Sequence, residues 1–101
     1  MAKKRIIWTK EARIDFKITL QFYTERNGSS DYSRKLADEI FQIIEKLQNN
    51  FFLSRQTSDS DVRVLIKEAF SIFYEIKENK ILILVVWDSR RNPDELKKYV
   101  P

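Results

Sequence analysis

The ionisable side chains of this sequence lack the two residue types that serve most often in acid–base and nucleophilic chemistry. There is no His and no Cys among the 101 residues. A Ser-His-Asp triad, a His general base, a thiolate metal site and a disulfide framework are therefore excluded. The chain has one glycine, so it offers no Gly-rich loop to hold phosphates. We expect no cofactor and no bound metal.

Arg63 is the best single candidate for holding an anion. Val62, Val64 and Ile66 alternate along the expected strand, which places Arg63 on the opposite side. If the protein acts on RNA, this guanidinium would hold the scissile phosphate through two parallel hydrogen bonds. The alternative is a solvated ion pair across the sheet, with Glu75 as the partner. The sequence favours neither interpretation over the other.

Two further arginines, Arg90 and Arg91, follow a long apolar run. They could contact phosphate or an acidic protein surface. The alternative is that one of them pairs with Asp88 or Asp94 and fixes the start of the tail. We expect one structural arginine and one that is available to a partner. Asp88 is better suited to orienting an arginine than to acting as a base.

The spacing of apolar residues predicts the elements that position these side chains. Leu36, Ile40, Ile44 and Leu47 give a strongly one-sided helix. Residues 81–87 form a continuous apolar run, which is typical of a strand buried on both faces. The full expectation is a strand at 6–8, helices from Thr9 to Asn27-Gly28 and from Ser29-Ser30-Asp31 to Asn49-Asn50, a loop at 54–61, strands at 62–67, 72–77 and 81–87, and a helical turn from Pro93.

The segment after Thr9 has an ambiguous pattern. Its apolar residues alternate strictly with polar ones, which taken alone indicates a strand. A capping hydroxyl at Thr9 and a glycine at position 28 favour a helix, which we predict. Such a helix carries two apolar stripes. The first stripe is Ala12, Phe16, Leu20 and Tyr23, and the second stripe is Ile14, Ile18 and Phe22.

The second stripe has no evident place in the core if the first stripe faces the sheet. An exposed apolar stripe usually marks a protein contact. We therefore predict that Ile14, Ile18 and Phe22 bind a segment of a partner protein or a second copy of the chain. The alternative is that Ile40 or Ile44 of the neighbouring helix covers the stripe.

Composition limits the protein to one small domain, residues 1–101, with a basic surface. The net charge is +4 and the isoelectric point is about 9.4, which fits an anionic partner or ordinary surface solubility. No apolar run approaches the roughly 18 residues that span a bilayer. The basic start is not followed by the apolar region of a signal peptide. We expect a cytoplasmic protein without a membrane partner.

The order of the elements and several local motifs resemble the RelE/ParE superfamily of toxins. The motifs are Ile6-Ile7-Trp8-Thr9 before the helical hairpin, Val62-Arg63, Phe70-Ser71-Ile72-Phe73-Tyr74-Glu75-Ile76, and Val85-Val86-Trp87-Asp88-Ser89-Arg90-Arg91-Asn92-Pro93. The tail motif, Trp-Asp-x-Arg-Arg-Asn-Pro, is the most specific. The resemblance implies an α+β fold of order β-α-α-β-β-β, with the hairpin packed on a four-stranded, mostly antiparallel sheet.

The resemblance also implies a function, namely the toxin of a bacterial type II toxin–antitoxin (plasmid stabilisation) system that arrests growth. Its partners would be a cognate antitoxin, bound by Ile14, Ile18 and Phe22, and either DNA gyrase or the ribosome with its mRNA. We favour ParE-like inhibition of gyrase, since no acid–base pair stands out. The alternative is a RelE-like, metal-independent mRNA endonuclease that uses Arg63, Arg90 and Arg91. A further alternative is an inactive relic that binds only its antitoxin.

Overall fold

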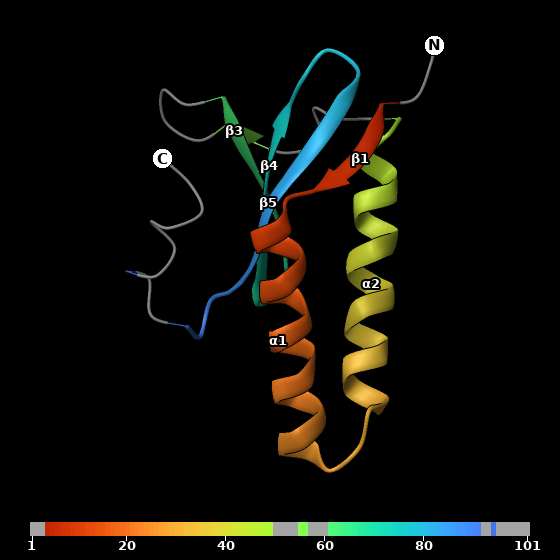
Figure 1. Ribbon diagram of the computed structural model, residues 1–101, viewed down its shortest axis with the longest axis vertical. Helices are drawn as coiled ribbons and strands as arrows, with labels where there is room; N and C mark the ends of the chain where they lie inside the picture. Colours follow the sequence, from red (N-terminus) through yellow and green to blue (C-terminus); the bar gives the residue numbers. More distant parts are fainter. Residues whose placement is uncertain (1–3, 50–54, 57–60, 92–93, 95–101) are drawn as a thin grey trace.

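The protein has two layers, a mixed sheet and a hairpin of two helices (Figure 1). The computed structural model describes residues 4–49, 55–56, 61–91 and 94. The elements are β1 (Arg5–Trp8), α1 (Lys10–Asn27), α2 (Asp31–Leu47), β2 (Arg55–Gln56), β3 (Val62–Lys67), β4 (Phe70–Ile76) and β5 (Lys80–Asp88). The predicted α+β class and the order of the main elements are confirmed.

The strands lie in the order β1-β5-β4-β3-β2. Short connections make β3, β4 and β5 a run of antiparallel neighbours. Strand β1 pairs with β5 in parallel, with Ile6 opposite Ile81. The two-residue strand β2 lies within the predicted loop 54–61 and pairs with β3. A segment this short carries no alternation that could reveal it, and most of the predicted loop lies outside the described residues.

Helix α1 resolves the ambiguous alternating segment in favour of a helix. The Thr9 hydroxyl accepts a hydrogen bond of 3.0 Å from the backbone N–H of Ala12, which caps the first turn. At the other end, Gly28 adopts a left-handed conformation with φ of 68°, and its N–H bonds back to the helix. Both predicted caps are therefore present.

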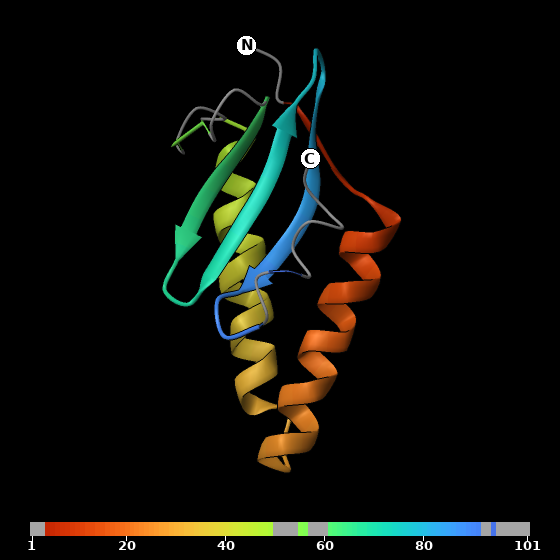
Figure 2. The ribbon, with the colours of Figure 1, turned by 90° about the vertical axis from the view of Figure 1, so that its left-hand side faces the viewer.

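The two apolar stripes of α1 have different surroundings. In the first stripe, Ala12, Phe16 and Tyr23 are buried in the core. The second stripe is exposed, with 47% of Ile14, 59% of Ile18 and 54% of Phe22 accessible to solvent. The helix hairpin does not cover this stripe, because Ile40 and Ile44 of α2 are buried in the core instead. Figures 1 and 2 show that the lower turns of both helices extend past the sheet.

Strand β5 is the central buried element, as its continuous apolar run predicts. Ile81, Ile83, Val85 and Val86 are at most 1% exposed, and Trp87 is also buried. The strand ends at Asp88, and it contacts α1 as well as both neighbouring strands. It therefore fixes the position of the polar residues that follow it. The helical turn predicted from Pro93 lies outside the described residues, apart from Asp94.

None of the helices in the described part of the chain is long and apolar enough to cross a membrane.

Candidate functional site

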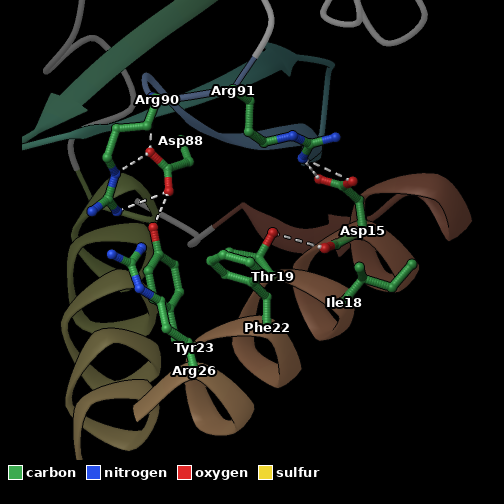
Figure 3. A pocket seen from close by; sticks show the side chains of 9 residues that line it. All are labelled: Asp15, Ile18, Thr19, Phe22, Tyr23, Arg26, Asp88, Arg90 and Arg91. Atoms are coloured by element: carbon green, nitrogen blue, oxygen red, sulfur yellow. Dashed lines mark hydrogen bonds and ion pairs between the residues drawn. The ribbon is translucent and has the colours of Figure 1, made fainter.

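The end of β5 and one face of α1 bring a carboxylate, a phenol and a guanidinium together (Figure 3). Tyr23 donates its hydroxyl hydrogen to Oδ2 of Asp88. Arg90 donates from Nε to Oδ1 and from Nη2 to Oδ2 of Asp88, each at 2.8 Å. The backbone N–H of Arg90 adds a third bond to Oδ1 at 3.0 Å. The Arg90 guanidinium also lies 5.0 Å from the centroid of the Tyr23 ring.

These contacts fix the protonation states of the cluster. Burial by itself would raise the pKa of Asp88, but the hydrogen bonds from Arg90 and Tyr23 outweigh it and lower this pKa below its usual value. Burial, together with the bond to Asp88, raises the pKa of Tyr23 to about 12. The bond to Asp88 also raises the pKa of Arg90. At neutral pH the cluster therefore holds a carboxylate, a neutral phenol and a guanidinium.

A second ion pair joins α1 to the same segment. Arg91 donates from Nη1 to both carboxylate oxygens of Asp15, at 2.9 and 2.7 Å. Its guanidinium lies 4.5 Å from the centroid of the Trp87 ring. Asp15 is buried, and Thr19 donates a hydrogen bond of 3.1 Å to its backbone carbonyl. The residues that follow β5 are thus held to α1 at two points.

A pocket of about 410 Å³ lies between α1 and the chain after β5. We call it the α1 pocket, and its lining residues are Asp15, Ile18, Thr19, Phe22, Tyr23, Arg26, Asp88, Arg90 and Arg91. Those from α1 recur at intervals of three and four, so they share one face of the helix. Figure 3 shows Tyr23 pointing toward Asp88 and Asp15 pointing toward Arg91.

The three candidate residues near the tail, Asp88, Arg90 and Arg91, line this pocket. Asp88 orients Arg90, as the sequence predicts. The sequence leads us to expect one structural arginine and one that is available to a partner. Arg90 and Arg91 both form ion pairs within the chain. Arg90 is the more accessible of the two, with 52% of its side chain exposed against 27% for Arg91. Each arginine faces a carboxylate that would otherwise be buried without a counter-charge, which accounts for the pairing.

Arg63 lies elsewhere, on β3, and does not line the α1 pocket. It is half-buried, and its partner in the register is the fully buried Tyr74. Glu75 faces Val62 instead and forms an ion pair with Lys77 at 2.9 Å. The suggested cross-strand position of Glu75 opposite Arg63 is therefore wrong by one residue. The register is set by the short turn between Lys67, which ends β3, and Phe70, which begins β4.

Four residues that line the pocket were not predicted as site residues from the sequence, namely Asp15, Thr19, Tyr23 and Arg26. Tyr23 fits the first stripe by its ring, and nothing in that pattern identifies the partner of its hydroxyl. Asp15 occupies a polar position of the alternating segment. The available signal was the spacing of Asp15, Thr19 and Tyr23, each four residues apart, which places three polar groups on one helix face.

The arrangement is suited to binding rather than to acid–base catalysis. Asp88 has a lowered pKa and is occupied by donors, so it is a weak base. Tyr23 keeps its proton far above neutral pH, so it is a weak acid. Among the described residues, no group of three or more acidic side chains is placed to hold a metal ion.

Comparison with known proteins identifies relatives of this chain. The model of the family described as "ParE toxin of type II toxin-antitoxin system, parDE" matches residues 6–93. A solved structure titled "Chromosomal ParDE TA system from P. aeruginosa" has the same fold, with a TM-score of 0.75 and 23% sequence identity. The match covers 85% of this chain and 96% of that chain. A comparison with curated proteins gave no match.

Proposed function

Since the chain belongs to the ParE toxin family of type II toxin–antitoxin systems, we propose that it arrests bacterial growth by inhibiting DNA gyrase without cutting nucleic acid. As a member of that family, it is the toxin of such a pair and has a cognate antitoxin as its partner. Because gyrase acts on the bacterial chromosome, the proposal places the toxin in the cytoplasm.

The observation that carries the proposal is the state of the ionisable groups in the α1 pocket. RNA cleavage requires a base for the 2′-hydroxyl, a cation for the phosphate and an acid for the leaving oxygen. Arg90 and Arg91 are each paired with a carboxylate, and the nearby phenol of Tyr23 is a weak acid at neutral pH. A carboxylate beside each arginine would also repel an incoming phosphate. These features support a binding role.

In this proposal Arg90 and Arg91 belong to the surface that contacts gyrase. Arg90 has half of its side chain exposed while Asp88 holds its guanidinium in place, so the group meets a partner with little loss of conformational freedom. In the alternative, a ribosome-dependent mRNA endonuclease, Arg63 would hold the scissile phosphate. Its place on β3, outside the α1 pocket, supports this alternative less well.

The test is to express the chain alone in bacteria and examine arrested cells for both kinds of damage. We expect covalent gyrase–DNA complexes to accumulate while the 5′ ends of mRNA, mapped by primer extension, stay unchanged. Arg90→Ala should reduce these complexes, whereas Arg34→Ala, at an exposed position of α2, serves as the matched control.

Two outcomes would overturn the proposal. New mRNA 5′ ends inside translated codons, absent when translation is blocked, would establish the endonuclease and make Arg63→Ala the next variant. Normal growth during expression of the folded chain would identify an inactive relic.

A further inference from the structure

The α1 pocket combines an apolar wall with an open mouth. Ile18 and Phe22 belong to the second stripe of α1, and more than half of each side chain is exposed. Both line the pocket, whereas Ile14 of the same stripe does not. When a partner's apolar side chain enters such a concave site, it displaces water from the large apolar side chains around it.

The polar lining of the pocket carries an excess of positive charge. Three arginines face two aspartates, and the two aspartates are paired with Arg90 and Arg91. The third arginine, Arg26, lies one helical turn after Phe22 and is exposed. Figure 3 shows the guanidinium groups of Arg26 and Arg90 on the same side of the pocket, next to Tyr23. A carboxylate placed there would meet both groups.

We propose that the α1 pocket receives an apolar side chain of the antitoxin and that Arg26 and Arg90 bind a carboxylate next to it in the antitoxin sequence. The apolar group lies against Ile18 and Phe22, and the carboxylate lies at the arginine side. This inference rests on the toxin assignment, but it does not depend on gyrase being the target.

The charges favour an acidic antitoxin segment over a second copy of this chain. A two-fold dimer would place the same patch on both sides of the interface. Arg26 and Arg90 of one copy would then face the same arginines of the other, at a cost in Coulomb energy. An acidic segment would instead be attracted by these arginines. The apolar wall of Ile18 and Phe22 also distinguishes this pocket from a surface that binds nucleic acid. Such a surface contacts the phosphates, sugars and base edges of the nucleic acid.

The ion pair between Arg90 and Asp88 prepares the pocket for such a ligand. Asp88 accepts hydrogen bonds from Nε and Nη2 of Arg90, and Tyr32 of α2 also bonds to this guanidinium. These bonds fix the plane of the guanidinium while half of the side chain stays exposed. Tyr23 holds Asp88 from the other side. We therefore expect Tyr23 to act as a positioning residue for antitoxin binding.

The experiment measures the affinity of purified variants for the full-length antitoxin encoded beside this chain, by calorimetry at low and high salt. Phe22→Ser and Ile18→Ser should each weaken binding by about tenfold or more. Arg26→Glu should do the same at low salt, and the loss should shrink at high salt. The matched controls are Ile66→Ser on β3, where the side chain is 57% exposed, Ile14→Ser outside the pocket, and Arg34→Glu on α2. They should change the affinity by less than about threefold.

A charge exchange identifies the carboxylate. Each acidic residue of the antitoxin is changed to Lys in turn, and one such variant should restore binding to Arg26→Glu. Losses no larger for Arg26→Glu than for Arg34→Glu, or no rescue by any lysine, would overturn the proposal. So would sedimentation of the free chain as a dimer that Phe22→Ser dissociates, because a second copy would then occupy the pocket. The affinity is measured with purified toxin and antitoxin in the absence of gyrase and ribosomes, so its result is independent of the test of the target.

Discussion

Tyr23, in the last part of α1, donates its hydroxyl hydrogen to Asp88, the final residue of β5 and 65 positions away in the chain. This bond links the helix hairpin to the point where the chain leaves the sheet. The same carboxylate holds Arg90, so the three residues form one polar cluster at the edge of the core. Removing one member of such a buried cluster destabilises the protein, because the polar groups that remain stay desolvated but have lost a hydrogen-bond partner.

Replacing Tyr23 with Phe should destabilise the protein and change how its stability depends on alkaline pH. We expect a loss of about 1–2 kcal/mol at pH 7, because the buried carboxylate of Asp88 loses one donor. The pKa of Tyr23 is raised to about 12 from 10.0. The folded state therefore keeps this proton in a range where the unfolded state has lost it, so wild-type stability falls as pH rises from about 10. Urea denaturation at pH 7 to 11 should show a smaller alkaline loss in the variant.

Asp88→Asn should destabilise the protein at neutral pH, and this effect should disappear at acidic pH. The pKa of Asp88 is lowered in the folded protein from an ordinary value of 3.8, because Arg90 and Tyr23 donate hydrogen bonds to the carboxylate. Its contribution is therefore present above that ordinary value and is lost as pH falls through the folded-state pKa. We expect the variant to be less stable than the wild type by about 1–3 kcal/mol at pH 7. The difference should shrink below about pH 4. A difference that stays constant from pH 7 to pH 3 would rule out a charged Asp88 as its source.

Glu68 occupies a strained position in the turn between β3 and β4. Its φ is 54°, in the left-handed region that favours glycine, and it is the only non-glycine residue of positive φ among the described residues. Glu68→Gly should therefore stabilise the protein by up to about 1 kcal/mol. This corresponds to a rise in Tm of about 4–8 °C for a domain of this size. Glu78→Gly, in the turn before β5, is the matched control and should show no such rise.

Truncating a buried isoleucine and truncating an exposed isoleucine of the helices should change the free energy of unfolding by different amounts. Ile40 is completely buried, so Ile40→Ala should cost about 2–5 kcal/mol in the free energy of unfolding. Ile18 is mostly exposed in the free chain, so Ile18→Ala should change stability by less than about 0.5 kcal/mol. Chemical denaturation of the free chain measures both. Similar losses for the two variants would mean that α1 packs differently from the arrangement described.

Most of the fold could be predicted because α2 and β5 carry patterns with one interpretation. Helix α2 is apolar on one face, and β5 is apolar from Ile81 to Trp87. Helix α1 was harder, since its period of two indicates a strand, and only the caps at Thr9 and Gly28 decide for a helix. Two-residue β2 leaves no periodic signal at all.

The site was predictable only where its residues are neighbours in sequence. Asp88 and Arg90 are two positions apart, so their pairing could be anticipated. Asp15 and Arg91 are 76 positions apart, and a polar residue on a helix carries no information about a partner at that separation. The opposition of Arg63 and Tyr74 depends on the register of β3 and β4, where a turn displaced by one residue changes every pair.

The most direct test of the proposed function is the supercoiling activity of purified DNA gyrase in the presence of the purified chain. The chain should inhibit supercoiling, and adding the antitoxin should restore it. Full gyrase activity at a large excess of folded chain, together with cutting of mRNA on purified ribosomes, would contradict it.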